Sequence, residues 1–308
     1  MAAFPGAPRE RLRYTRRVDA PLQDKVIVVT GAGRGIGLAC ATLLGRLGAH
    51  LVINDLGCDE AGEGADPTVV AGLARTLEDA GVPVVAHAGD ASDPESAAAL
   101  TALALSHFGR LDGVLASAGV TQRARFTRTT REQRQRVFAV GVEAPLALIQ
   151  AAHEPMRKAG GGSVVVMTGG AAFQGQRRDL AATMAQAAVV GMVRTAALEL
   201  RPDGVRVNAV APTALTRQTA DLPLFHKGSA RLTADHVAPL VAFLLSDQSR
   251  DVSGQVLGIA GSRFFAHHTS ETDGYFGDTD DVLSLDDIAR HWKAVHPFNP
   301  ETAFVWKP

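Results

Sequence analysis

The sequence holds few of the residues that disulfide scaffolds, metal sites and aromatic cores require. Its two cysteines, Cys40 and Cys58, form no CxxC pair and no His/Cys spacing suited to zinc, so no metal site is expected. Such cysteine usage is typical of a reducing cytosol. Aromatic residues make up only 5% of the chain while 46% of it is apolar, so alanine, valine and leucine must build most of the core.

Long apolar runs and an excess of charge are also missing. No stretch approaches the roughly 18 uninterrupted apolar residues of a membrane span, and the first 17 residues do not resemble a signal peptide. We therefore expect a cytoplasmic protein with no membrane partner. The formal net charge of −1 argues against nucleic acid as a partner. One basic cluster, Arg9–Arg17, is interpreted as a solvated arm, with an electrostatic docking arm as the alternative.

Short apolar runs alternate with longer amphipathic segments along most of the chain, which is typical of strand–helix units around a parallel sheet. The length of 308 residues suits one such domain. We therefore predict an α/β, doubly wound Rossmann fold with a seven-stranded parallel sheet. The expected strands are Lys25–Val29, His50–Asn54, Pro83–His87, Leu111–Ala116, Ser163–Met167, Val205–Val210 and Gln255–Ile259. The expected helices are Gly35–Leu47, Pro67–Ala80, Pro94–Phe108, Thr130–Lys158, Leu180–Leu200 and Thr233–Leu245.

The two ends of the chain differ from this repeating pattern. We divide the sequence into an N-terminal arm (1–21), a nucleotide-binding domain (22–262) and a polar C-terminal extension (263–308). Within the extension, Ser284 followed by acidic residues predicts the start of a helix. We expect the extension to lie over the domain or over a neighbouring subunit.

A glycine-rich turn, Thr30-Gly31-Ala32-Gly33-Arg34-Gly35-Ile36-Gly37, lies between the first strand and the first helix. Its glycines let the backbone approach a pyrophosphate, whose charge the helix N-terminus favours. Asp55 ends the next strand, where it can accept hydrogen bonds from an adenosine ribose and repel a 2′-phosphate. The turn therefore predicts binding of NAD in preference to NADP, and a turn that binds nothing is the alternative.

Several further segments follow in the order of the short-chain dehydrogenase/reductase (SDR) superfamily, which the sequence resembles across residues 22–262. Thr30–Gly37 resembles the TGxxxGxG motif, and Arg206-Val207-Asn208 with Pro212 resembles the RVN…P stretch. Asn54–Gly57 and Pro212–Arg217 are most similar to the (3R)-hydroxyacyl-CoA dehydrogenase domains of peroxisomal multifunctional enzymes. The resemblance implies that the cofactor is held by Thr30, Gly31, Gly33, Arg34, Gly35, Ile36, Gly37, Asp55, Asp90, Ala91, Ser117, Ala118, Gly119, Pro212 and Leu215.

The family's catalytic residues have no counterparts at the matching positions. The resemblance implies a tyrosine acid/base, a lysine that lowers its pKa, a serine that polarises the carbonyl and an asparagine in a proton relay. A segment similar to YSASKAAVVGL places Ala182 at the tyrosine position and Gln186 at the lysine position. The serine position falls on Gly169, or on Gly170 with a one-residue gap, and the asparagine position on Gly141. Since a positioned general acid contributes ~10²–10⁴ in rate, ordinary carbonyl reduction should be crippled.

A shifted alignment does not restore this set of residues. The only tyrosines are Tyr14 and Tyr275, and neither lies near the segment that begins at Ala182. The lysines are Lys25, Lys158, Lys227, Lys293 and Lys307. We therefore expect a wider, less polar pocket beside the nicotinamide.

Polar residues of the bordering loops are the candidates for replacement chemistry. They are Thr168, Gln176, Arg177, Arg178, Asp179, Thr183, Gln186 and His226. Either arginine could hold a carboxylate, phosphate or enolate, and His226 could act as a general base. The alternatives are that Arg177 and Arg178 lie in a solvated loop and that Thr183 and Gln186 are ordinary helix residues. For His226 the alternative is a surface position in a lid. Tyr275 could enter the pocket of a neighbouring subunit.

Three functions are compatible with these observations. The first is an NAD(H)-binding enzyme with non-redox or unusual chemistry, such as dehydration, cyclisation or rearrangement, on a carbonyl-containing small molecule or acyl thioester. The second is an NAD-dependent hydroxyacyl or ketone oxidoreductase with displaced catalytic groups. The third is an inactive subunit that pairs with an active relative. Thr130–Lys158 and Leu180–Leu200 correspond to the superfamily's four-helix interface, which implies a homodimer, a homotetramer or a hetero-oligomer with an active relative.

Overall fold

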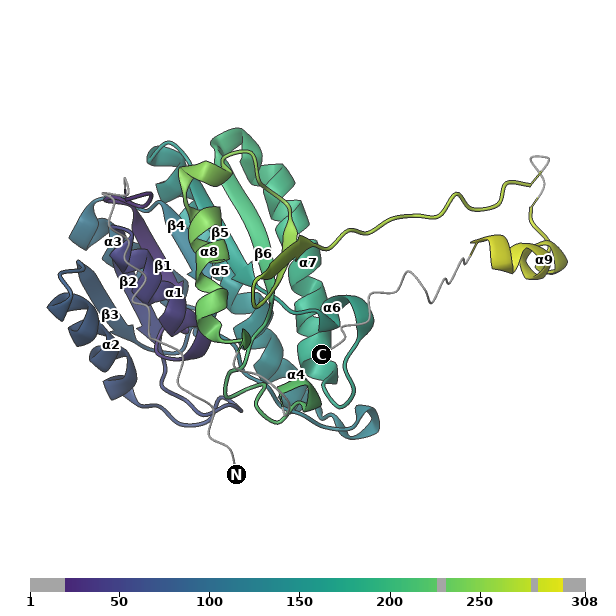
Figure 1. The fold of residues 1–308 in the computed structure, drawn as a ribbon, viewed down its shortest axis with the longest axis horizontal. Coiled ribbons are helices and arrows are strands. Elements are labelled where there is room, and N and C mark those ends of the chain that lie inside the picture. The colour runs from purple at the N-terminus through teal and green to yellow at the C-terminus, as the bar shows by residue number, and fades with distance from the viewer. Residues whose placement is uncertain (1–19, 226–230, 278–281, 296–308) are drawn as a thin grey trace, which may run out of the picture. The chain divides into compact units, whose positions relative to one another are not determined.

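A central sheet organises the computed structural model, which describes residues 20–225, 231–277 and 282–295 (Figure 1). In sheet order, the strands are β3 (Val84–Ala88), β2 (His50–Asp55), β1 (Val26–Thr30), β4 (Gly113–Ala116), β5 (Gly162–Met167), β6 (Val205–Thr213), β7 (Val256–Ala260) and β8 (Arg263–Ala266). The first seven are parallel, as predicted, and β8 is antiparallel to β7. The sheet therefore has eight strands rather than the predicted seven. The four-residue β8 escaped prediction because it lies directly after the turn that ends the repeating pattern.

The strand order reverses between β1 and its two neighbours. β1 pairs with β2 on one side and with β4 on the other, so the chain leaves the carboxyl ends of β1 and β4 in opposite directions. All five residues of β1 are buried, which fits a strand that is covered on both faces and has an apolar sequence. Open parallel sheets bind ligands outside the strand ends at such a reversal, so this edge is where a site is expected.

Helices cover both faces of the sheet (Figure 1). One apolar cluster joins the sheet to α1 (Gly35–Arg46), α2 (Pro67–Asp79) and α8 (Ala238–Leu245). A second cluster joins the opposite face to α3 (Ser96–Phe108), α5 (Ala144–Lys158) and α7 (Leu180–Leu200). Short and branched apolar side chains fill both clusters, as the low aromatic content requires.

The predicted helix Thr130–Lys158 is interrupted. It consists of α4 (Arg131–Phe138), a π-helical turn (Ala139–Glu143) and α5. Pro145, in the first turn of α5, has no N–H to donate to the carbonyl of the preceding turn, and its ring disfavours regular α geometry there. The widened turn accommodates this defect, and it carries Val140 and Gly141.

The run Leu180–Asp203 is, by length and composition, the one segment among the described residues that could cross a membrane. Within it, Val189, Val193 and Ala197 pack into the cluster beneath the sheet. A helix that packs into the core needs apolar side chains, so packing against the sheet accounts for the apolar composition of this run.

The chain forms two compact units, and the first ends at Ala266 because β8 pairs with β7. The second begins at His267 and contains α9 (Leu285–Val295). Ser284 caps α9 as predicted, since its hydroxyl accepts the backbone N–H of Asp287 at 3.1 Å. Tyr275 stacks on His291 in this same unit, with ring centroids 3.6 Å apart. The basic cluster Arg9–Arg17 lies outside the described residues.

A buried amide joins β6 to the turn before β7 and allows a stability prediction. Asn208, which is fully buried, donates to the carbonyl of Val252 at 2.9 Å and accepts the N–H of Gln255 at 3.0 Å. Replacing it with leucine leaves two backbone groups unpaired, so Asn208→Leu should lower the free energy of unfolding by roughly 2–4 kcal/mol in urea titrations. Gln255→Ala, which removes an exposed side chain, should change it by less than about 1 kcal/mol. Equal stabilities of the two variants would contradict the role of the amide.

Candidate functional site

Two positions in the glycine-rich turn, Gly31 and Gly37, require glycine because backbone atoms approach them closely at the end of β1. Gly31 has φ +65°, and a Cβ there would lie 2.6 Å from Cα of Ala118. A Cβ on Gly37 would lie 2.0 Å from the carbonyl oxygen of Gly31. The turn therefore packs against the segment after β4 and against the first turn of α1. Arg34, at the N-cap of α1, makes no side-chain capping bond, so its side chain satisfies none of the first-turn N–H groups.

Asp55, at the end of β2, holds this turn from the side. One of its carboxylate oxygens accepts the N–H of Gly33 at 2.8 Å, and the other accepts the N–H of Gly57 at 2.7 Å. Each oxygen keeps a further lone pair, and the residue lines a cleft of about 280 Å³ beside the glycine turn. The carboxylate is therefore fixed in place while it can still accept hydrogen bonds from a ligand.

Most of the predicted cofactor residues meet at this cleft. Those that line it are Gly31, Arg34, Gly35, Ile36, Gly37, Asp55, Asp90, Ala91, Ser117, Ala118 and Gly119. Thr30 and Pro212 line the adjoining cavity instead. Gly33 takes part through its bond to Asp55, whereas Leu215 lines neither space and donates its backbone N–H to the carbonyl of Leu232.

Two arginines of the cleft were missed by the sequence reasoning. Arg136 of α4 pairs with Asp90 at 2.8 Å, and Arg217 from the loop after β6 donates to the carbonyl of Cys58 at 2.8 Å. Burial pushes the pKa of Asp90 upward, but hydrogen bonds from Ser92 and Arg136 outweigh it and hold that pKa below its usual value. With Arg34, these residues give the cleft a positive side that suits an anionic ligand.

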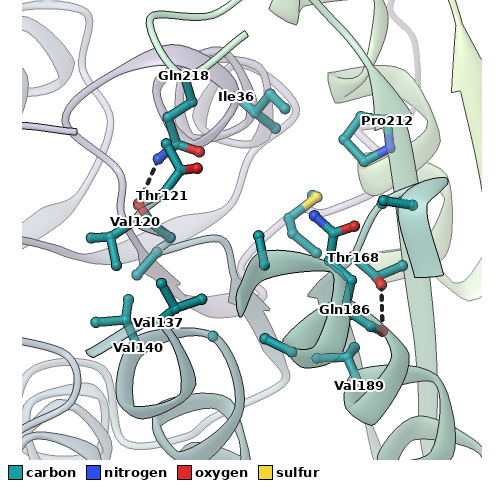
Figure 2. Close-up of a pocket in the computed structure, with 18 of the residues that line it drawn as sticks. Ile36, Val120, Thr121, Val137, Val140, Thr168, Gln186, Val189, Pro212 and Gln218 are labelled. Atoms are coloured by element: carbon teal, nitrogen blue, oxygen red, sulfur yellow. Dashed lines mark hydrogen bonds between the residues drawn. The ribbon is translucent and has the colours of Figure 1, made fainter. Parts of the chain in front are cut away.

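A second cavity, of about 350 Å³, adjoins the cleft (Figure 2). Ile36, Gly119 and Gln218 are among the residues that line both spaces. The second cavity lies between the ends of β5 and β6, the π-helical turn and α7. The four positions aligned with the family's catalytic residues, Gly141, Gly169, Ala182 and Gln186, all line it. The side chains at these positions therefore determine the chemistry available in the cavity.

Gln186 and Gly169 are in direct contact across the cavity wall. A Cβ on Gly169 would lie 2.5 Å from Oε1 of Gln186, so the amide occupies the place where a side chain at residue 169 would begin. Figure 2 shows the Gln186 amide reaching from α7 into the cavity. Its Oε1 is buried and has no hydrogen-bond partner among the described residues. A side chain at residue 169 would therefore require the Gln186 amide to move from this position.

The other candidate residues have different surroundings. Thr168 lines the cavity, but its hydroxyl donates to the backbone carbonyl of Gln186 at 2.9 Å. Thr183 has a buried hydroxyl with no partner among the described residues, although the residue is not part of the lining. His226 lies outside the described residues.

Arg177 and Arg178 are exposed and do not line the cavity. The reason lies in the backbone, because the carbonyl of Arg178 accepts the N–H of Ala124 at 3.0 Å and Arg178 adopts φ +64°. This bridge brings the next residue, Asp179, to the cavity and leaves both arginine side chains in solvent. The predicted anion-holding role of the two arginines is therefore not supported by their positions.

Asp179 is the buried acid of this cavity. It is 7% exposed, and its Oδ2 lies 3.7 Å from Nε of Arg123, beyond hydrogen-bond distance. Burial raises the pKa of the Asp179 carboxyl, and Arg123 and Thr121 oppose the rise only in part. Oδ1 of Asp179, Nε of Arg123 and Oγ1 of Thr121 are all buried without hydrogen-bond partners in the described parts of the chain, and all three residues line the cavity. Nothing in the sequence pattern connects residues 121, 123 and 179.

Comparison with known proteins identifies the relatives of this chain. Residues 31–261 match the family described as Enoyl-(Acyl carrier protein) reductase. A protein of Mycobacterium tuberculosis named as a short-chain type dehydrogenase/reductase is 31% identical, over 89% of this chain and 94% of its own length. L-rhamnose 1-dehydrogenase (NAD(P)(+)) of Azotobacter vinelandii is 30% identical, over 79% of this chain and 98% of its own. A crystal structure of a short chain dehydrogenase from Mycobacterium avium superimposes with a TM-score of 0.77 at 28% identity, covering 89% and 95% of the two chains.

The under-bonded carboxyl of Asp179 predicts a stability that depends on pH. Because its pKa is raised in the folded state, ionisation of Asp179 costs stability as pH rises through that pKa, and the cost is absent below the unfolded pKa. Asp179→Asn should therefore stabilise the protein at pH 7.5 by roughly 1–3 kcal/mol in thermal or urea unfolding, and the gain should shrink at pH 4.5.

Asp221→Asn is the matched control, since Asp221 pairs with the same arginine through a side chain that is 68% exposed. It should change stability by less than about 1 kcal/mol at either pH. A destabilised Asp179→Asn protein, or a gain that is independent of pH, would show that Asp179 is well paired in the folded state.

Proposed function

This chain belongs to the short-chain dehydrogenase/reductase superfamily of oxidoreductases, and from that premise we propose that it is an NAD(H)-binding enzyme that acts on a carbonyl-containing small molecule or acyl thioester without a tyrosine–lysine pair. The observation that carries the proposal is the contact between Gln186 and Gly169 beside Ala182. These three residues occupy the aligned lysine, serine and tyrosine positions. The cavity adjoins a cleft whose glycines and carboxylate suit a dinucleotide.

The residues of the cleft fit a nicotinamide dinucleotide. Gly31 and Gly37 let the turn pack closely against Ala118 and α1, and both glycines line the cleft where a pyrophosphate would lie. Asp55 is fixed by two backbone N–H groups and keeps free acceptor capacity. When bound, NAD(H) supplies a hydride donor or acceptor to the superfamily's chemistry. Asp55 supports the proposed preference for NAD, because its carboxylate would repel a 2′-phosphate.

The cavity favours non-redox chemistry such as dehydration, cyclisation or rearrangement. The methyl group of Ala182 has no proton to give, and Gly169 and Gly141 supply no side-chain donor. The Gln186 amide can present its NH₂ group to a carbonyl or enolate oxygen, and an oriented dipole of this kind stabilises charge that develops there. Gln186 is therefore proposed to hold the substrate oxygen.

A dehydrogenase with displaced catalytic groups is the second candidate. It is favoured by the names of the relatives and by the presence of an ionisable group, Asp179, in the same cavity. In that case the proton that tyrosine exchanges in the family would have to pass through a different residue.

We also propose a cytoplasmic protein that forms a homodimer or homotetramer, or pairs with an active relative. Exposed apolar residues on α7, Met184 and Leu198, support an interface there, together with the exposed Ala187. Ala197 of the same helix is instead buried within the chain and cannot contribute.

The cofactor preference depends on Asp55. Wild-type protein should bind NADH at least about tenfold more tightly than NADPH, measured by the fluorescence of the reduced nicotinamide, because a 2′-phosphate would face the carboxylate. Asp55→Ala should bring the ratio of the NADH and NADPH affinities below about threefold. It should also lower the affinity for NADH, because the bonds to Gly33 and Gly57 are lost. Asp59→Asn, a change in the same segment outside the cleft lining, should keep the wild-type ratio. Equal affinities in the wild type would contradict the preference.

Restoring the family's residues tests whether the cavity is merely a degraded reductase. The double variant Ala182→Tyr, Gln186→Lys should show no ketone-dependent loss of absorbance at 340 nm beyond that of the wild type, while NADH affinity stays within about threefold. The phenol instead fills the space in front of Ala182 and excludes small molecules that bind the wild-type cavity. A gain of about 10² or more in ketone reduction would show that the cavity still has reductase geometry.

A further inference from the structure

Three polar atoms at one end of the substrate cavity have no partner in the described parts of the chain. They are Oδ1 of Asp179, Nε of Arg123 and Oγ1 of Thr121, and we call these three residues the polar corner. All three residues line the cavity, which places a carboxylate, a guanidinium and a hydroxyl at its wall. Buried polar groups almost always have hydrogen-bond partners, so three unpaired atoms in one place can accommodate a water molecule or a polar group of a ligand.

The polar corner is held by backbone and side-chain contacts, so it is built before any ligand arrives. Asp179 immediately follows Arg178, whose carbonyl accepts the N–H of Ala124. Arg123 is fixed from the other side, because its guanidinium also donates to Asp221 and to the carbonyl of Gln218. The unpaired atoms therefore belong to side chains whose positions are set by other contacts.

The charges of the polar corner restrict what it can bind. An ammonium group would face the guanidinium of Arg123 and has no lone pair to accept the hydrogen bond of its Nε. A carboxylate or phosphate would face Asp179, with Asp221 adding a second negative charge on the far side of Arg123. A hydroxyl group is neutral, donates to a carboxylate and accepts from a guanidinium or a second hydroxyl. It is the ligand group that satisfies the corner without an uncompensated charge.

We propose that the polar corner is a subsite for a hydroxyl group of the substrate, in which Asp179 accepts the hydroxyl hydrogen and Arg123 or Thr121 donates to the hydroxyl oxygen. The inference rests on the proposed function, because it requires that this cavity holds the substrate. It adds the substrate class: a hydroxylated carbonyl compound, with the carbonyl oxygen near Gln186 and a hydroxyl group at Asp179. Apolar side chains, among them Val137, Val140 and Val189, also line the cavity and suit the carbon skeleton of a ligand.

The test compares ligands that differ by one hydroxyl group. Cyclohexanone and its 3- and 4-hydroxy derivatives are titrated by NMR into protein without added dinucleotide, so that no hydride can be transferred to or from the ligands. For the wild type, at least one hydroxy derivative should bind ten times or more as tightly as cyclohexanone, which corresponds to about 1.4 kcal/mol. Asp179→Leu, of similar size but with no acceptor, should reduce that ratio to threefold or less, with no loss of affinity for cyclohexanone.

Two further variants keep the test decisive. Thr121→Val removes a hydroxyl at constant shape and should lower the ratio in the same direction if Asp179→Leu does not fold. Asp221→Asn, outside the cavity lining, keeps an oxygen that can accept from Arg123 and removes only the charge, so it should retain the wild-type ratio and show that the charge of Asp221 is not the cause.

The outcomes separate the two levels of the proposal. If cyclohexanone and its hydroxy derivatives bind equally well to the wild type, or if the ratio survives in both Asp179→Leu and Thr121→Val, the hydroxyl subsite is wrong while the proposed substrate cavity stands. If none of the probes binds up to its solubility limit, both the subsite and the cavity assignment are overturned.

Discussion

The close approach of two backbone segments at the carboxyl end of β1 is the constraint on which this site depends. Gly31 lies against Ala118, and Gly37 lies against Gly31, at separations that no side chain permits. These contacts bring the turn after β1 and the segment after β4 together at the reversal in strand order. The nucleotide cleft and the adjoining cavity both open from this junction, so their lining residues come from segments far apart in the sequence.

The two halves of the site differ in what they conserve of the superfamily's chemistry. In the cleft, Asp55 and the glycines keep the form expected of a dinucleotide cradle. In the cavity, Gln186 and Gly169 are in contact, and in our proposal they stand where the sequence resemblance implies a lysine and a serine. A side chain at residue 169 would require the Gln186 amide to shift, so the present position of the amide depends on the absence of a side chain there.

The sequence alone was sufficient for the central strands and for the cleft, because local signals identify them. The uniformly apolar β1, the glycine turn and Asp55 each occupy consecutive or regularly spaced positions. The interrupted helix was missed although Pro145 was visible, because a proline near a helix start is compatible with several geometries. The polar corner could not be predicted, since Arg123 and Asp179 are brought together by a backbone bridge between Ala124 and Arg178 rather than by any sequence period. The sequence also does not reveal which of the adjacent charged residues Arg177, Arg178 and Asp179 faces the cavity, because the local backbone conformation decides it.

We propose that the cavity beside the nucleotide cleft does not support ordinary carbonyl reduction. A single-turnover experiment tests it most directly: protein loaded with NADH deuterated at C4 is mixed with a panel of ketones and hydroxyketones, and the products are analysed by mass spectrometry. Both C4 positions are labelled, so the stereochemistry of transfer does not matter. The account predicts that the NADH stays reduced and that no product carries deuterium. Deuterium at the carbinol carbon of any product, formed within the first turnover, would contradict it.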